Sequence, residues 1–222
     1  VLALLGAQSV QRAFKRPAIG GQDSRSGSLK DLDVRESLIS FACSTTPIES
    51  VMDNVAKTIG NKLYLLDASH YEDGSFNLEQ THERYRTLEN LIQTKKVKAV
   101  HSARKGIAVS ALEMVFGNDL GLMIATSMDV LIARPAALLI ESDVQLDLNG
   151  FTHIGQITET NYVINGIELD VKRVQHAYQT GLDFLYPIYA KAKDHIIPTI
   201  TTKGSYAPYK GPKIDSVKVV IP

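Results

Sequence analysis

The stretch that decides the fold of this chain is VHSARKGIAVSALEMVFGNDLG, Val100 to Gly121. It begins at the end of an apolar run that starts at Val97 and predicts a buried strand. After a sharp turn, apolar residues recur at helical spacing, and the polar residues Ser110 and Glu113 fall on the other side of the predicted helix. The apolar positions are Ile107, Ala108, Ala111, Leu112, Val115 and Phe116. Gly117-Asn118 then predicts a left-handed stop, because glycine has no Cβ to clash there.

A strand, a turn and a helix in this order place backbone N–H groups at the start of the helix, where an anion can be held. The alternative is an ordinary strand-to-helix connection packed in an α/β core. The pattern alone favours this alternative.

Outward from this unit, strand patterns and helix patterns interleave along the chain. The predicted strands span 37–44, 61–67, 120–126, 136–141 and 151–158, and Asn165-Gly166 joins two short strands, 162–164 and 167–168, as a tight hairpin. The predicted helices span 1–16, 77–96 and 170–187. This alternation predicts an α/β or α+β fold, with helices packed on a mixed β-sheet.

Three local patterns give further predictions. Asn77 caps the second helix, with Gln80 in the reciprocal position of a capping box. The run Ser37 to Ser44 is nearly continuous in apolar residues, which predicts a strand buried on both faces and makes Cys43 a small buried hydrophobe. The segment Gln22 to Asp33 is rich in Gly, Ser and Asp, which predicts a loop.

Composition limits the possible functions. Of the 222 residues 44% are hydrophobic, enough for a real core, and 24 basic residues balance 24 acidic ones. Balanced charge argues against nucleic-acid or membrane-surface binding driven by net charge, and no apolar stretch is long enough for a membrane helix. A single cysteine excludes an internal disulfide and fits a reducing cytoplasm. The chain lacks an initiator Met, and we interpret its start as the inside of a longer chain, cut within a helix.

Two sequence blocks resemble the AIR synthase superfamily. Gly106 to Gly121, GIAVSALEMVFGNDLG, is similar to the GGLAVALAEMAFGNxLG stretch of that superfamily's C-terminal domains. Pro17 to Val34, PAIGGQDSRSGSLKDLDV, is similar to PAIGGKDSMSGTFxDLDV. Together the blocks most resemble the long form of the phosphoribosylformylglycinamidine synthases. The tail agrees, because Val217 to Pro222 resembles the opening strand of the class I glutaminase domain that follows in those enzymes.

The resemblance implies a part in an ATP- and glutamine-dependent C–N ligase of purine biosynthesis. In that reaction ATP, with Mg²⁺, activates the amide oxygen of formylglycinamide ribonucleotide, and ammonia from glutamine displaces the phosphate to give the amidine. Residues 1–34 would be the remnant of a preceding synthase domain, 35–187 the C-terminal α/β domain of the second synthase half, and 188–222 a strap toward the glutaminase domain. The implied partners are those other domains of the same parent chain, with no nucleic acid or membrane.

The loop from Gly20 to Gly27 is the best candidate for holding a phosphate. Glycines allow close backbone approach, serines donate hydrogen bonds, an arginine can bind two oxygens, and an aspartate can meet a magnesium ion. The candidate residues are Gly20, Gly21, Asp23, Ser24, Arg25 and Ser26, with Asp23 as the candidate metal ligand. The loop departs from the family's pattern, since Gln22 stands where Lys is usual and Arg25 where Met is usual.

The central turn departs further from the family's His-Asp-x-Ser-Asp-Gly-Gly. The sequence here is HSARKG, from His101 to Gly106, so both acidic positions are lost and the turn has no carboxylate ligand for magnesium. Arg104 and Lys105 at the helix start are candidates for holding a phosphate directly. A degenerate site kept only for packing is an equally good interpretation.

No catalytic residue is expected in this chain, and we expect the piece alone to be inactive. ATP or ADP and Mg²⁺ are implied for the parent enzyme. Glu141 and Asp143, with Asp147 nearby, are interpreted as a solvated loop rather than as paired carboxylates. Two alternatives stay open: a non-catalytic scaffold domain, or another ATP-using superfamily member, related to selenophosphate synthetase or thiamine-phosphate kinase.

Overall fold

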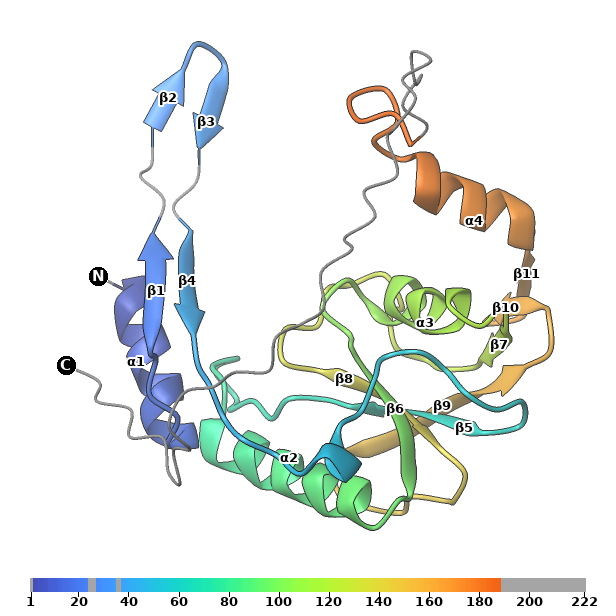
Figure 1. The fold of residues 1–222 in the computed structure, drawn as a ribbon, viewed down its shortest axis with the longest axis horizontal. Coiled ribbons are helices and arrows are strands. Elements are labelled where there is room, and N and C mark those ends of the chain that lie inside the picture. Colours follow the sequence, from blue (N-terminus) through green and yellow to red (C-terminus); the bar gives the residue numbers. More distant parts are fainter. Residues whose placement is uncertain (1, 24–26, 35–36, 189–222) are drawn as a thin grey trace, which may run out of the picture.

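The fold is centred on a seven-stranded mixed sheet, which confirms the predicted α/β class. The computed structural model describes residues 2–23, 27–34 and 37–188. In spatial order the strands are β11 (Ile167–Leu169), β10 (Tyr162–Ile164), β7 (Gly121–Ile124), β9 (Phe151–Thr158), β5 (Lys62–Leu66), β8 (Leu138–Ser142) and β6 (Val97–Ser102). The helices that accompany the sheet are α2 (Leu78–Gln93), α3 (Ile107–Phe116) and α4 (Val171–Thr180), with a short 3₁₀ turn η1 (Ile48–Ser50). Figure 1 shows α2 and α3 on opposite faces of the sheet.

Two hydrophobic clusters hold these helices to the sheet. Side chains alternate along a strand, so β5 contributes Leu63 and Leu65 to the cluster under α3, and Tyr64 and Leu66 to the cluster under α2. All four side chains are at most 2% exposed. The strand is therefore covered on both faces, as its continuous apolar sequence predicts.

The central strand and helix lie where the sequence places them, but the helix is rotated relative to the predicted face. Met114 is fully buried, and Ser110, predicted on the polar side, is also fully buried, whereas Phe116 is only partly buried. The left-handed residue that ends the helix is Asp119, with a φ of 51°, and not Gly117, whose φ is −68°. The helix packs against the sheet on a broader face than its apolar stripe alone indicates.

The other caps are close to prediction. The Asn77 side chain accepts from the Gln80 N–H, as expected, but the Gln80 side chain accepts from the Ser69 hydroxyl and not from the Asn77 backbone. Asp170 caps α4 by accepting from the Arg173 N–H at 2.8 Å. The predicted extension of this helix to residue 187 is wrong, since α4 ends at Thr180.

The N-terminal segment forms an arm outside the main sheet (Figure 1). Its elements are α1 (Leu2–Phe14), β1 (Gly20–Asp23), β2 (Gly27–Leu29), β3 (Leu32–Val34) and β4 (Leu38–Phe41). β1 pairs with β4 and β2 with β3, so the predicted loop over 22–33 is largely a ribbon of short strands. The strand predicted over 37–44 is present as β4, but its predicted burial is wrong, because β4 pairs with β1 in this ribbon and all four of its residues are exposed, as is Cys43.

Glu141 corrects a further interpretation. It lies within β8, fully buried, and its carboxylate accepts from the N–H groups of Lys57 and Thr58 and from the Asn61 amide, at 2.7–2.9 Å. It therefore fixes the chain that enters β5, and it is not part of a solvated loop.

The hairpin at Asn165-Gly166 is confirmed, with φ values of 50° and 80° at the two turn residues. None of the helices in the described ranges has the length and apolar content needed to cross a bilayer.

Candidate functional site

The strands β5 and β6 run in the same direction and end at one edge of the sheet, the kind of place where α/β proteins commonly bind ligands. β5 and β6 both pair antiparallel with β8, and Leu138 faces both Leu66 and Ser102. The residues that follow these strands, Asp67 and the turn from Ser102 to Gly106, therefore lie at the same edge. This edge is the structural setting of the predicted central site.

Backbone contacts close the central turn tightly. The Ala103 N–H donates to Ala137 O at 2.8 Å, and the Gly106 N–H donates to Ala103 O at 2.9 Å. The Ala108 N–H, one of the free donors at the start of α3, is taken by Val130 O at 2.9 Å. The segment around Val130 thus lies over the helix start, where an anion was expected to bind.

Lys105, a predicted phosphate ligand, forms an ion pair with Glu113. Its ammonium lies 2.6 Å from one carboxylate oxygen of Glu113, and the His101 ring lies 3.7 Å from the other. The Glu113 side chain is only 10% exposed, and the Tyr178 hydroxyl on α4 also donates to it. The sequence pattern placed Glu113 on the solvent side of the helix and therefore did not predict the polar groups that gather around its carboxylate.

The charges in this cluster stabilise one another. Burial raises the pKa of Glu113, but the hydrogen bonds from Lys105 and Tyr178 and the positive charge of Lys105 outweigh it, so the pKa lies below its ordinary value. The hydrogen bond to Glu113 correspondingly raises the pKa of Lys105, and raises that of Tyr178. The Lys105–Glu113 ion pair and the Tyr178 hydroxyl therefore link the turn, α3 and α4.

Arg104 is the cation of the turn that stays available. It is exposed, and within the described part of the chain it has no hydrogen bond or ion pair.

A second basic group at the same edge was not found by sequence reasoning. Arg134 donates to the Asp67 carboxylate at 2.6 Å and Arg84 donates to Asp67 O at 2.8 Å, while the Nε atoms of both arginines are buried without a partner among the described residues. The only sequence signal was an acidic residue, Asp67, directly after a strongly apolar strand.

The described residues of the predicted Gly20–Gly27 loop lie in the arm and not at this edge. Figure 1 shows the arm extending away from the sheet, apart from the turn at the end of β6. Gly20 and Gly21 are strand residues of β1, and a Cβ on Gly21 would lie 2.6 Å from Ile39 O, so close strand pairing accounts for this glycine. Asp23 ends β1, whereas Ser24, Arg25 and Ser26 lie outside the described residues.

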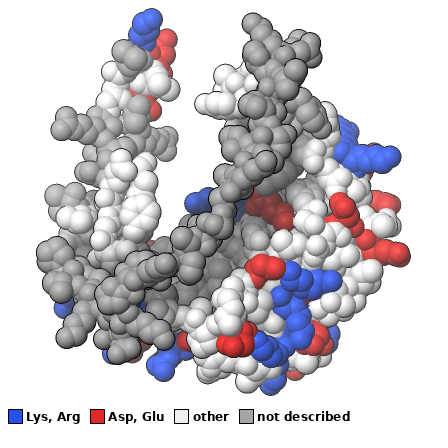
Figure 2. All heavy atoms as spheres, in the orientation of Figure 1, with Lys and Arg blue, Asp and Glu red and all other residues white. Residues whose placement is uncertain are grey.

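The described residues at this edge do not fit a magnesium site. Within the described ranges, no three His, Cys, Asp or Glu side chains are grouped so that they could hold a metal ion. At the turn itself Glu113 is the carboxylate at hand, and its oxygens are engaged by Lys105 and His101. Figure 2 shows basic and acidic side chains mixed over the visible face of the sheet domain, in keeping with the balanced net charge.

Comparison with solved structures finds this fold in a known enzyme. Thermotoga maritima PurL complexed with FGAR is similar with a TM-score of 0.54 and 11% sequence identity, over 95% of this chain and 39% of that chain. Similarities with lower scores include E. coli HypE, a hydrogenase maturation protein (TM-score 0.43, 16% identity, 64% of this chain and 59% of that chain), and Aquifex aeolicus thiamine monophosphate kinase (TM-score 0.40, 13% identity, 53% of this chain and 54% of that chain). The chain spans between 27% and 39% of the PurL chains that it matches. No family model matches the sequence, and no curated protein matches it either.

Proposed function

We propose that this chain belongs to the AIR synthase superfamily and is the C-terminal α/β domain of the second half of a long-form phosphoribosylformylglycinamidine synthase. Residues 1–34 would belong to the preceding domain, 35–187 to the α/β domain and 188–222 to the strap toward a glutaminase domain. The fold shared with PurL and the two sequence blocks support this assignment. The parent enzyme would form the amidine from formylglycinamide ribonucleotide with ATP and glutamine.

Within that enzyme, we propose that this domain acts as a scaffold and not as a centre for Mg²⁺–ATP chemistry. The observation that carries this is the Lys105–Glu113 ion pair at 2.6 Å, because it engages one of the two cations of the turn together with the nearest carboxylate. A magnesium–nucleotide site needs carboxylate oxygens that face the metal and cations that face phosphate. Here those charges neutralise each other, and Val130 O takes a helix N–H that a phosphate would use.

A second candidate function is direct anion holding without a metal. It is favoured by Arg104, which is exposed and unpaired within the described residues, and by the two buried Nε atoms of Arg84 and Arg134 at the same edge. A guanidinium can bind two phosphate oxygens at once. In this case the domain would hold a nucleotide or phosphate as a structural ligand.

Calorimetric titration of ADP into the purified chain, with and without Mg²⁺, separates the two. The scaffold function predicts no saturable binding. The anion-holding function predicts binding that does not need Mg²⁺ and is weakened about tenfold or more by Arg104→Ala, because a charge-assisted hydrogen bond contributes about 1.5–3 kcal/mol. The matched control is Arg173→Ala, which removes an exposed arginine elsewhere, on α4, and should leave ADP binding unchanged.

The assignment to a larger synthase is tested by complementation. We expect amidine formation when this chain is combined with the remaining synthase and glutaminase domains, and none from the chain alone. Mg²⁺-dependent ATP hydrolysis or amidine formation by the chain alone would overturn the scaffold role. A reconstituted enzyme whose rate is the same with and without this chain would overturn the assignment to the synthase.

A further inference from the structure

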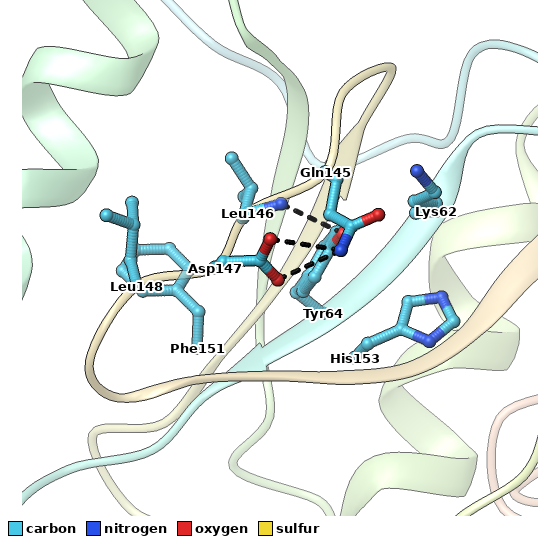
Figure 3. A pocket seen from close by; sticks show the side chains of 8 residues that line it. All are labelled: Lys62, Tyr64, Gln145, Leu146, Asp147, Leu148, Phe151 and His153. Atoms are coloured by element: carbon cyan, nitrogen blue, oxygen red, sulfur yellow. Dashed lines mark hydrogen bonds between the residues drawn. The ribbon is translucent and has the colours of Figure 1, made fainter.

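A separate hollow lies on the α2 side of the sheet, away from the central turn. Its volume is about 350 Å³, and its floor is formed by Tyr64 on β5 and by β9, with the loop after β8 as one wall (Figure 3). Lys62 and Tyr64 point to the face opposite Leu63 and Leu65, which pack under α3. The sheet therefore separates this hollow from the turn, and its volume falls in the lower range of small-molecule sites.

The wall of the hollow is held in place by the fold itself. The Leu146 N–H donates to the Tyr64 hydroxyl oxygen at 3.0 Å, and the Leu146 side chain is 4% exposed within the α2 cluster. The Phe151 N–H donates to Leu148 O at 3.1 Å, which closes the loop onto the start of β9. A wall fixed by such contacts is preorganised, so binding there loses little conformational entropy.

Three hydrogen-bond donors face this space without an acceptor. Tyr64 is 2% exposed, and its hydroxyl accepts from Leu146 but donates to no group in the described part of the chain. Neither the Lys62 ammonium nor the His153 ring has a hydrogen-bond or ion-pair partner among the described residues. The His153 ring packs edge-on against the Tyr64 ring, at 5.3 Å between centroids. Tyr64 is buried, Lys62 is half-buried and His153 is exposed, so a ligand acceptor placed between them would complete the bonding of the Tyr64 hydroxyl and would also face the charge of Lys62.

The opposite side of the hollow has the complementary charge. Figure 3 shows Lys62 and His153 on one side of Tyr64, and Asp147 with Leu148 and Phe151 on the other. Both Asp147 carboxylate oxygens accept from the neutral Gln145 amide at 3.0 Å, and no cation neutralises Asp147 within the described residues. The hollow thus presents donors at one end, a carboxylate at the other, and apolar side chains beside the carboxylate.

We propose that this hollow binds a free α-amino acid with an apolar side chain. The ligand carboxylate accepts from Lys62, His153 and the Tyr64 hydroxyl. Its ammonium group donates to Asp147, and its side chain lies over Leu148 and Phe151. A zwitterion fits better than a simple anion, because it satisfies the unpaired charges at both ends of the hollow. This site does not depend on the function proposed for the central turn.

Calorimetric titration of the purified chain tests the site with three probes of matched size. These are L-phenylalanine, 3-phenylpropionate, which lacks the ammonium group, and phenethylamine, which lacks the carboxylate. We expect saturable binding of L-phenylalanine below about 10 mM, and at least tenfold weaker binding of both analogues. Because this series uses the unaltered chain, it does not depend on the folding of any variant.

Substitutions then place the ligand. Lys62→Met and Asp147→Asn should each weaken L-phenylalanine binding about tenfold or more, while Lys172→Met, a change of an exposed lysine on α4, should leave it unchanged. Absence of saturable binding by L-phenylalanine overturns the proposal. Equal binding of 3-phenylpropionate overturns the zwitterion assignment, and binding that survives both substitutions overturns the location.

Discussion

Replacing Gly106 by alanine tests whether backbone packing fixes the central turn. Gly106 has a φ of 92°, and a Cβ there would lie 2.9 Å from the carbonyl oxygens of both Val130 and Leu131. The left-handed backbone costs about 1–2 kcal/mol for an L side chain. The overlap adds about 1–3 kcal/mol, because the carbonyl of Val130 is itself hydrogen bonded to α3 and cannot move freely. We therefore expect Gly106→Ala to lower the free energy of unfolding by about 2–5 kcal/mol.

Gly60→Ala is the matched control, because Gly60 has a φ of 87° but nothing within 4 Å of an added Cβ. It should cost only the backbone part, about 1–2 kcal/mol. Urea unfolding followed by circular dichroism measures both variants, and at a slope of about 1–3 kcal/mol per molar urea the difference is a clear shift of the midpoint. If Gly106→Ala and Gly60→Ala unfold at the same urea concentration, the segment at Val130 does not close the turn and the reasoning fails.

Three further predictions concern buried or charged groups of the sheet and its helices. Glu141→Gln should lower the free energy of unfolding by about 2–4 kcal/mol in urea, because the amide NH₂ would face at least one buried backbone N–H that the carboxylate now accepts. The control Asp143→Asn, at an exposed carboxylate, should change the free energy of unfolding by less than about 1 kcal/mol. Met114→Ala should lower the melting temperature more than Phe116→Ala, since Met114 is fully buried and Phe116 only partly; the reverse order would mean that the helix face drawn here is wrong. Burial raises the pKa of Glu113, but its hydrogen bonds outweigh this and leave the pKa below the ordinary value of 4.5. The stability that ionised Glu113 contributes is therefore present above about pH 4.5 and is lost as the pH falls. The melting temperature of Glu113→Gln should accordingly decrease less than that of the unaltered chain between about pH 5 and pH 3. An equal decrease in both would contradict the ion pair at Glu113.

The sequence predicted the sheet domain well because its signals there are local. The strand Lys62–Leu66 is a continuous apolar run, the hairpin is marked by Asn165-Gly166, and Asp170 caps α4 within its own turn. Each of these features depends on residues within a few positions of one another. Such local patterns can be recognised without knowledge of which segments pack together in the fold.

The errors arose where the partner of a segment decides its burial. The apolar run at 37–44 resembles a central strand, yet β4 pairs only with β1 in a two-stranded ribbon, so Leu38 and Phe41 are 43% and 54% exposed. The polar Ser110 and Glu113 were assigned to solvent by helical periodicity. Glu113 is covered because Lys105 and Tyr178 reach it from the turn and from α4, which the periodicity of α3 alone does not encode.

The two sequence blocks predicted the fold, and the geometry of their glycines gives the reason. Gly21 lies against Ile39 O and Gly106 against the carbonyls of Val130 and Leu131. Gly117 lies 2.9 Å, at its Cβ position, from a methyl group of Val55. These glycines are required by close approach of chain segments, whether or not a nucleotide binds nearby. The chemistry of the turn depends instead on the side chains between Ser102 and Lys105, where the family's carboxylates are missing. The glycines of the two blocks therefore carry information about the fold, whereas the proposed scaffold role rests on the side chains of the turn.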